Sequence, residues 1–257
     1  MNFFFLVILT FFSLSLFGQI TYTNQSTELG IEHAYGIGVE LGGGVSLMDF
    51  NDDGWDDITL TSSIGENIHF YQNNNGSFDR INVIDNFQES KHPLWVDFDN
   101  DGDKDLFVTF HNSTNRLYEN TGGLNMVDIT HQAGLFLDTD STFGGAFGDY
   151  DKDGWLDLAI VNRTFDKSPN TPELILYKNN GNKTFTDVSV SSGVANVIPN
   201  GPFCVSFIDY DNDGWDDIYT VQDKYYGNTL FKNYGDGTFS DVSISSGAGI
   251  FIGAMCI

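Results

Sequence analysis

Basic residues are scarce in this sequence. Only 11 of its 257 residues are Lys or Arg, against 36 Asp or Glu, and the formal net charge is −25. Phosphate recognition needs basic patches, so this composition argues against nucleic-acid partners and against binding to anionic membranes. The excess carboxylates also repel one another in a compact state unless cations neutralise them.

Cysteine, proline and helical patterns are scarce as well. Two cysteines cannot form a disulfide framework. Cys204 and Cys256 lie in apolar, strand-like segments, so we expect free, buried thiols, although secretion would permit a bridge. Five prolines and the lack of helical periodicity favour an all-β chain. The 40% hydrophobic content suffices for a sizeable core.

One long hydrophobic run is present, at residues 3–17 (FFFLVILTFFSLSLF). It is shorter than the roughly 20 residues that cross a bilayer. Small residues follow it, which fits a secretory signal peptide, although no Lys or Arg precedes it. We expect a signal peptide at residues 1–18, a secreted or cell-surface protein, and no membrane span in the mature chain. An uncleaved anchor or a buried strand are the alternatives.

A nine-residue acidic loop occurs four times in the chain. The copies read DFNDDGWDD from Asp49, DFDNDGDKD from Asp97, DYDKDGWLD from Asp149 and DYDNDGWDD from Asp209. Two further elements follow in phase, of which the third repeat has YKNNGNKTF and then FTDVSVSSGV. The first repeat departs from this pattern after Phe78. Recurrence at about 50 residues is typical of repeat architectures.

Each repeat is predicted to be β throughout, in the order strand, acidic loop, strand, strand, tight turn, strand. Asn-Gly and Asp-Gly pairs at the turns, such as Asn180-Gly181, favour hairpins. Four antiparallel strands in about 50 residues form one blade of a β-propeller. A β-sandwich with acidic turns does not explain the common phase. We expect blades at about 42–83, 91–130, 143–190 and 203–243.

The two ends of the sequence resemble parts of a repeat. Tyr22–Ile31 matches the third element and is predicted to be a fourth strand without its first three. Residues 248–257 resemble a first strand. We therefore expect residues 20–31 and 248–257 to be orphan strands of a further blade, in an incomplete propeller that occupies residues 19–257.

The four acidic loops, compared with one another, indicate which positions bind a cation. Positions 1, 3, 5 and 9 always carry an oxygen side chain, whereas positions 4 and 8 accept Lys or Leu and should point outward. Position 6 is always glycine, which reaches positive φ easily. Position 7 is mostly Trp and should contribute its carbonyl. The predicted ligands are Asp49, Asn51, Asp53, Trp55, Asp57, Asp97, Asp99, Asp101, Asp103, Asp105, Asp149, Asp151, Asp153, Trp155, Asp157, Asp209, Asp211, Asp213, Trp215 and Asp217.

This donor set predicts about four Ca²⁺ ions. It consists of oxygens only, which suits calcium better than the tighter octahedron of magnesium. Soft metals are excluded, because the loops contain neither Cys nor His. An EF-hand does not fit, because position 12 falls within a predicted strand rather than being Glu. A plain acidic turn is the alternative, and four phased copies argue against it.

These motifs resemble FG-GAP/VCBS repeats, the calcium-bearing blades of integrin-α-type propellers. FGGA from Phe143 followed by FGD from Phe147 is close to the pattern that names the family. The order of DYDNDGWDD, N-x-G-x-G-T-F and F-x-D-V-S-x-x-x-G more narrowly resembles secreted cartilage-acidic-protein-like (ASPIC/UnbV-associated) proteins. The resemblance implies calcium in the hairpin between the first two strands of each blade. The altered first repeat and the missing last blades depart from it.

The resemblance leaves the function open, since such blades occur in adhesion proteins, lectin-like modules and enzymes. We expect a secreted binding, adhesion or scaffold module with structural calcium, whose partner is an extracellular protein or glycan. The alternative is a catalytic or non-catalytic propeller portion of a polysaccharide-active enzyme. Calcium buffering is a third hypothesis. We predict no catalytic residue, because no hydrolase motif is present and the histidines are scattered at His33, His69, His92, His111 and His131.

Overall fold

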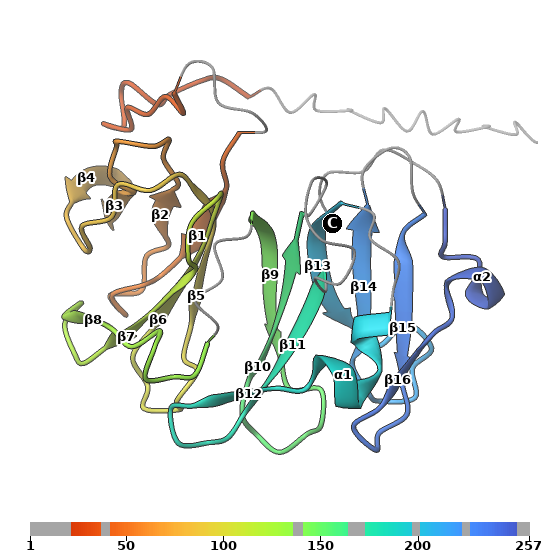
Figure 1. Cartoon of the computed structure of the whole chain (residues 1–257). Coiled ribbons are helices and arrows are strands. Elements are labelled where there is room, and N and C mark those ends of the chain that lie inside the picture. The colour runs from red at the N-terminus through yellow and green to blue at the C-terminus, as the bar shows by residue number, and fades with distance from the viewer. Residues whose placement is uncertain are drawn as a thin grey trace, which may run out of the picture.

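Figure 1 shows a computed structural model of the chain, which describes residues 22–36, 42–135, 141–163, 173–196, 201–222 and 227–250. The expected signal peptide, most of the expected C-terminal orphan strand and Cys256 lie outside these residues. Cys204 is half-buried. Within the described ranges, no helix combines the length and the apolar character that a membrane crossing requires.

The described residues form four antiparallel sheets of four strands each, and neighbouring strands in each sheet follow chain order. We call these sheets blades 1 to 4. Blade 1 comprises β1 (Val45–Met48), β2 (Asp57–Leu60), β3 (His69–Asn74) and β4 (Ser77–Ile81). Blade 2 comprises β5 (Ser90–Val96), β6 (Asp105–Phe110), β7 (Arg116–Asn120) and β8 (Met126–Asp128).

The other two blades have the same plan. Blade 3 comprises β9 (Thr142–Gly148), β10 (Asp157–Asn162), β11 (Leu174–Asn179) and β12 (Phe185–Asp187). Blade 4 comprises β13 (Pro202–Ile208), β14 (Asp217–Gln222), β15 (Thr229–Asn233) and β16 (Phe239–Asp241). Each acidic loop joins the first two strands of a blade. The predicted all-β fold of propeller blades is thereby confirmed.

The blades follow one another in an arc, with their first strands toward the middle and their fourth strands at the periphery (Figure 1). β1 packs on β5, β5 on β9, and β9 on β13. Three apolar cores lie between successive blades of the described chain. The second strand of each later blade contributes a fully buried residue to the core with its predecessor, namely Leu106, Leu158 or Ile218.

Blade 1 differs from the others on the side that a preceding blade would cover. Leu47 is 66% exposed and Val45 is 57% exposed. At the position of Leu47, blade 2 has Trp95, which is 6% exposed and stacks on Phe50 of blade 1. The apolar pattern is therefore the same in blade 1, but its contact with a preceding blade is missing among the described residues.

We had predicted that every repeat would be β throughout, which is wrong for the third element of blades 3 and 4. After the short strand β12, the chain forms the helix α1 (Ser189–Ser192) and a 3₁₀ helix (Val194–Asn196); after β16 it forms α2 (Ser243–Ser246). The cause is local, because the Asp187 carboxylate accepts hydrogen bonds from both the backbone N–H and the hydroxyl of Ser189. Such Asp–Ser turns compete with strand geometry.

Tyr22–Ile31 does not form the predicted strand either, although its likeness to the third element is real. Its end is a turn in which Ile31 N–H donates to the Ser26 carbonyl. The Leu29 carbonyl accepts from Phe78 N–H of β4 at 3.2 Å, as the Ala133 carbonyl accepts from Phe185 N–H of β12 at 2.7 Å. This segment therefore contacts blade 1 as the turn after blade 2 contacts blade 3.

Candidate metal centre

The first aspartate of every acidic loop closes the loop on itself. In the third loop, Asp149 Oδ1 accepts from Asp153 N–H and Oδ2 accepts from Gly154 N–H, both at 3.0 Å. The same two bonds occur in the other three loops at 2.7–3.1 Å. The position-5 carboxylate in turn accepts the position-7 N–H, as in the 3.0 Å bond from Trp155 to Asp153. The loops therefore share one conformation.

The position-9 aspartates are fully buried and join the loop to the third strand of the blade. Asp157 Oδ2 accepts from Tyr150 N–H at 3.2 Å, and its Oδ1 accepts from Asn179 N–H at 2.8 Å. Equivalent pairs occur at Asp57, Asp105 and Asp217. Burial raises the pKa of Asp157 to about 8 and that of Asp105 to about 7. A nearby cation would favour the ionised form.

Position 4 has a role that we did not predict. Its residues adopt positive φ, from 57° at Asp52 to 59° at Lys152 and Asn212, two residues before the glycine at position 6. Asn and Asp tolerate this conformation better than other side chains, which accounts for three of the four residues there. Lys152 is the exception, and its ammonium lies 4.4 Å from the centre of the Trp215 ring in the next loop.

Carboxylate oxygens converge in three of the four loops. Each set lies within 4.8 Å: Asp97, Asp99 and Asp101; Asp149, Asp151 and Asp157; and Asp209, Asp211 and Asp217. Asp151 Oδ1 is also buried without a hydrogen-bond partner. Converging carboxylates with a free buried oxygen fit a hard cation such as Ca²⁺. The three acidic clusters could therefore hold metal ions.

The predicted ligands differ in how closely they converge. Positions 1 and 3 belong to all three clusters, whereas position 5 joins only at Asp101, and position 9 joins only in the third and fourth loops. The first loop has Asn51 at position 3 and forms no acidic triple. Ligation by position 7 carbonyls stays a prediction.

Lysine side chains lie against the same carboxylates, which the sequence did not indicate. The Lys178 ammonium contacts Asp151 and lies 2.7 Å from Asp153 Oδ2. Desolvation disfavours this ammonium, but its hydrogen bonds to both carboxylates outweigh that cost and raise its pKa. Lys232 is placed in the same way in blade 4, and Lys183 of blade 3 lies 2.7 Å from Asp99 Oδ2 of blade 2. These ammonium groups partly neutralise the loops.

An asparagine connects each loop with the tight turn of its blade, and it is buried in blades 2, 3 and 4. The Asn179 amide donates to the Leu156 carbonyl of its own loop and to the Phe98 carbonyl of blade 2, and its Oδ1 accepts from Gly181 N–H. Asn233 bonds in the same way to Tyr150 of blade 3. We missed these residues, although the signal was present: asparagine recurs at the same place in every repeat, as Asn73, Asn120, Asn179 and Asn233.

The FG-GAP-like repeat family matches residues 49–108, 97–160 and 168–220, which together make up more than half of the chain. The chain belongs to the FG-GAP-like repeat family. In this FG-GAP-like chain, the first two matched stretches begin at the first residue of an acidic loop. All three end within the second strand of a blade. A search of curated proteins gives no match.

Among solved structures, a lectin of Agrocybe aegerita is similar to this FG-GAP-like chain. Its structure was described for specific recognition of non-reducing terminal N-acetylglucosamine. The TM-score is 0.48 and the identity 19%, over 80% of this chain and 52% of the lectin. The chain thus spans about half of the lectin's length. A likeness at this level says nothing of what this chain binds.

Substitutions at positions 9 and 3 should separate the contribution of the loop to stability from its contribution to calcium binding. Asp157→Asn leaves one buried N–H without an acceptor, so we expect a loss of about 1–3 kcal/mol of stability in chelator, and a larger loss in calcium because Asp157 belongs to the third cluster. Asp151→Asn reproduces what Asn51 provides in the first loop, so in chelator it should change stability by less than about 1 kcal/mol while lowering calcium affinity. Urea unfolding with Ca²⁺ and with EGTA checks both. Equal effects of the two variants in chelator would contradict this division.

Removing the lysine ammonium should strengthen calcium binding. We expect Lys178→Met to raise calcium affinity on the order of tenfold, because like charges a few ångströms apart repel by about 1–4 kcal/mol. The variant should also melt at a lower temperature in EGTA. Lys152→Met removes a lysine of the third loop itself, whose ammonium lies over Trp215 of the fourth loop, and serves as the control for the third site in calorimetric titration. Equal gains in both variants would indicate general electrostatics only.

Proposed function

We propose that this FG-GAP-like chain is a secreted, calcium-stabilised binding or scaffold module. The convergence of carboxylates in the acidic loops carries the proposal. Position 9 and the buried asparagine tie each loop to its blade, and in blades 3 and 4 to the preceding blade. An ion held there would offset the repulsion between carboxylates and so stabilise the contact between blades.

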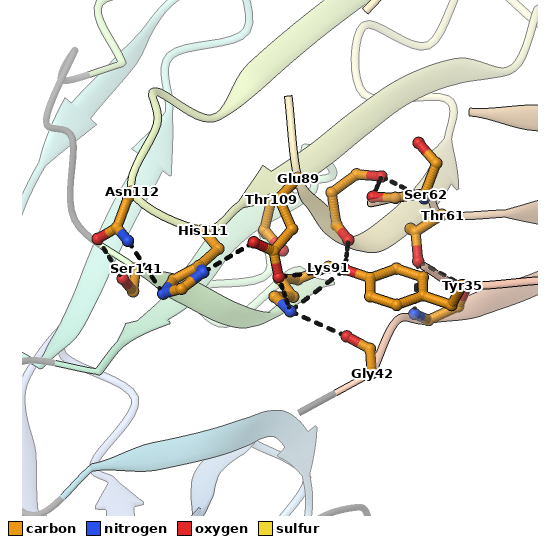
Figure 2. A network of polar contacts seen from close by, with 12 residues as sticks. Tyr35, Gly42, Thr61, Ser62, Glu89, Lys91, Thr109, His111, Asn112 and Ser141 are labelled. Carbon is orange, nitrogen blue, oxygen red and sulfur yellow. Dashed lines mark hydrogen bonds and ion pairs between the residues drawn. The ribbon is translucent and has the colours of Figure 1, made fainter. Parts of the chain in front are cut away.

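The charged groups at the start of β5 have a structural role, as a scaffold would use them. Figure 2 shows a network at the start of β5, at the strand end opposite the acidic loop. The Lys91 ammonium lies 2.6 Å from Glu89, and Glu89 lies 3.1 Å from the His111 imidazole. The Tyr35 hydroxyl donates to the Ser90 carbonyl at 2.9 Å. These groups bond one another and hold Tyr35 of the N-terminal segment against β5, which is a structural role.

An extracellular location is part of the proposal. The apolar run at residues 3–17 fits a signal peptide, and calcium modules outside the cell work at about 10⁻⁴–10⁻³ M. We propose that the chain is related to the secreted cartilage-acidic-protein-like proteins, because of the order of its acidic loop, Asn-Gly turn and F-x-D-V-S element. The partner class that we propose is an extracellular protein or a glycan.

Calcium removal should destabilise the protein strongly. A site at 100 times its Kd contributes about 2.7 kcal/mol, and each kcal/mol shifts the Tm of a chain of this size by about 2–4 °C. We expect EGTA to lower the Tm by at least about 10 °C and added Ca²⁺ to restore it. Mg²⁺ at the same concentration is the control and should restore less. A melting curve that is identical in EGTA and in Ca²⁺ would rule out structural calcium.

Binding without cleavage should distinguish the module from an enzyme. We expect immobilised extracellular glycans or matrix proteins to retain the chain in Ca²⁺ and to release it in EGTA, with no new reducing ends formed from soluble polysaccharide. The Asp151→Asn variant tests whether retention depends on the loops. Calcium-dependent appearance of reducing ends would instead support the polysaccharide-active alternative.

A further inference from the structure

Two histidines from distant parts of the sequence face each other at the edge of blade 1. His33 lies in the segment after the first turn, and His69 is the first residue of β3. Their Nδ1 atoms lie 3.3 Å apart, and their rings meet edge to face with centroids 4.6 Å apart. His69 is 8% exposed, and His33 is half-buried. The pair lies outside the acidic loops.

The two Nδ1 atoms are at hydrogen-bond distance from each other, and His69 Nδ1 also lies 3.4 Å from the Tyr71 hydroxyl. The same separation of the nitrogens suits shared coordination of one ion. Nitrogens bound to a tetrahedral Zn²⁺ at about 2.0–2.1 Å lie about 3.4 Å apart. Backbone groups of Thr61 and Glu32 hydrogen-bond the imidazoles of His33 and His69, respectively. Contacts of this kind orient metal-binding histidines.

The blade itself does not require an imidazole at this place. By strand register, the position of His69 is occupied in the other blades by Arg116, Ile175 and Thr229. A buried aliphatic side chain serves there in blade 3. The histidine pair is therefore a departure from the repeat, found where the N-terminal segment crosses blade 1.

The pair borders an open cavity of about 700 Å³. Glu66 also lines this cavity, and its negative charge acts on both imidazoles. The exposed guanidinium of Arg80 acts in the opposite direction. The cavity is polar, so water can enter and supply further ligands.

Both imidazoles are in the form that binds metals at neutral pH. Burial lowers the pKa of His33 and lowers that of His69 to about 4. Neutral imidazole is the ligating form, so a metal ion would not have to compete with protons at pH 7. The oxygen-only acidic loops, in contrast, favour hard cations.

We propose that His33 and His69 form a binding site for an imidazole-preferring divalent ion of the Zn²⁺ class, separate from the acidic loops, with water from the cavity that Glu66 also lines completing the coordination. The ion would join the N-terminal segment to blade 1. It would therefore stabilise a segment that has no strand pairing of its own within the described residues.

Zinc titration of the calcium-saturated chain tests this proposal. We expect one Zn²⁺ per chain beyond bound calcium, loss of at least tenfold in affinity in His33→Ala, and a smaller loss in Glu66→Gln. His131→Ala removes an exposed imidazole from the turn after β8 and should bind zinc as the unmodified chain does. Undiminished zinc binding by His33→Ala, or zinc that excess Ca²⁺ displaces, would overturn the proposal.

A second measurement avoids dependence on the folding of the variants. Diethylpyrocarbonate modifies unprotected imidazoles, and mass spectrometry locates each modified histidine. In the unmodified chain, Zn²⁺ should reduce modification of His33 and His69 while leaving His131 unchanged. Equal modification of His33 and His69 with and without Zn²⁺ would exclude the site, even if the variants were to unfold.

Discussion

Each blade depends on one carboxylate that is buried at the end of its acidic loop. Asp57, Asp105, Asp157 and Asp217 are 0% exposed, and both oxygens of each accept backbone N–H groups. One donor belongs to the aromatic residue at position 2, and the other belongs to the asparagine at the end of the third strand. A buried carboxylate is costly unless it is fully bonded. This group therefore fixes the loop, the aromatic residue at position 2 and the third strand together.

This constraint links the loops to the packing between blades. In blades 3 and 4, the asparagine that bonds the position-9 carboxylate also donates to the preceding blade, from Asn179 to Phe98 and from Asn233 to Tyr150. Adjacent loops touch directly as well, since the Asn100 amide donates to the Gly154 carbonyl at 3.0 Å. In a repeat protein, where each unit contacts only its neighbours, stability depends on such interfaces. Charge balance in one loop therefore affects two blades.

The sequence predicted the features that depend on local spacing. The four acidic loops, each followed by a tight turn at the same spacing, predicted the four sheets. The glycine at position 6 predicted a sharp bend, and φ there is 90° to 100°. It did not predict contacts between distant segments, such as Lys178 with Asp151 or Asn179 with Phe98. The turns after β12 and β16 were also missed. There a short strand passes into a helix within three residues. The helix depends on a hydrogen bond from Ser189 N–H to the Asp187 carboxylate, and hydrophobic periodicity does not reveal such a bond.

Comparing equivalent positions in the four repeats shows which residues the blades share and which are particular to one blade. Lys91, with its partner Glu89, lies where blades 3 and 4 have Phe143 and Phe203. A buried ion pair seldom adds much stability over apolar packing, but it can specify a unique arrangement. Here it bonds the hydroxyl of Tyr35, while the hydroxyl of Tyr71 donates to the Glu32 carbonyl. The N-terminal segment is thus positioned on blades 1 and 2 by polar contacts at several points, which defines its place without a strand ladder.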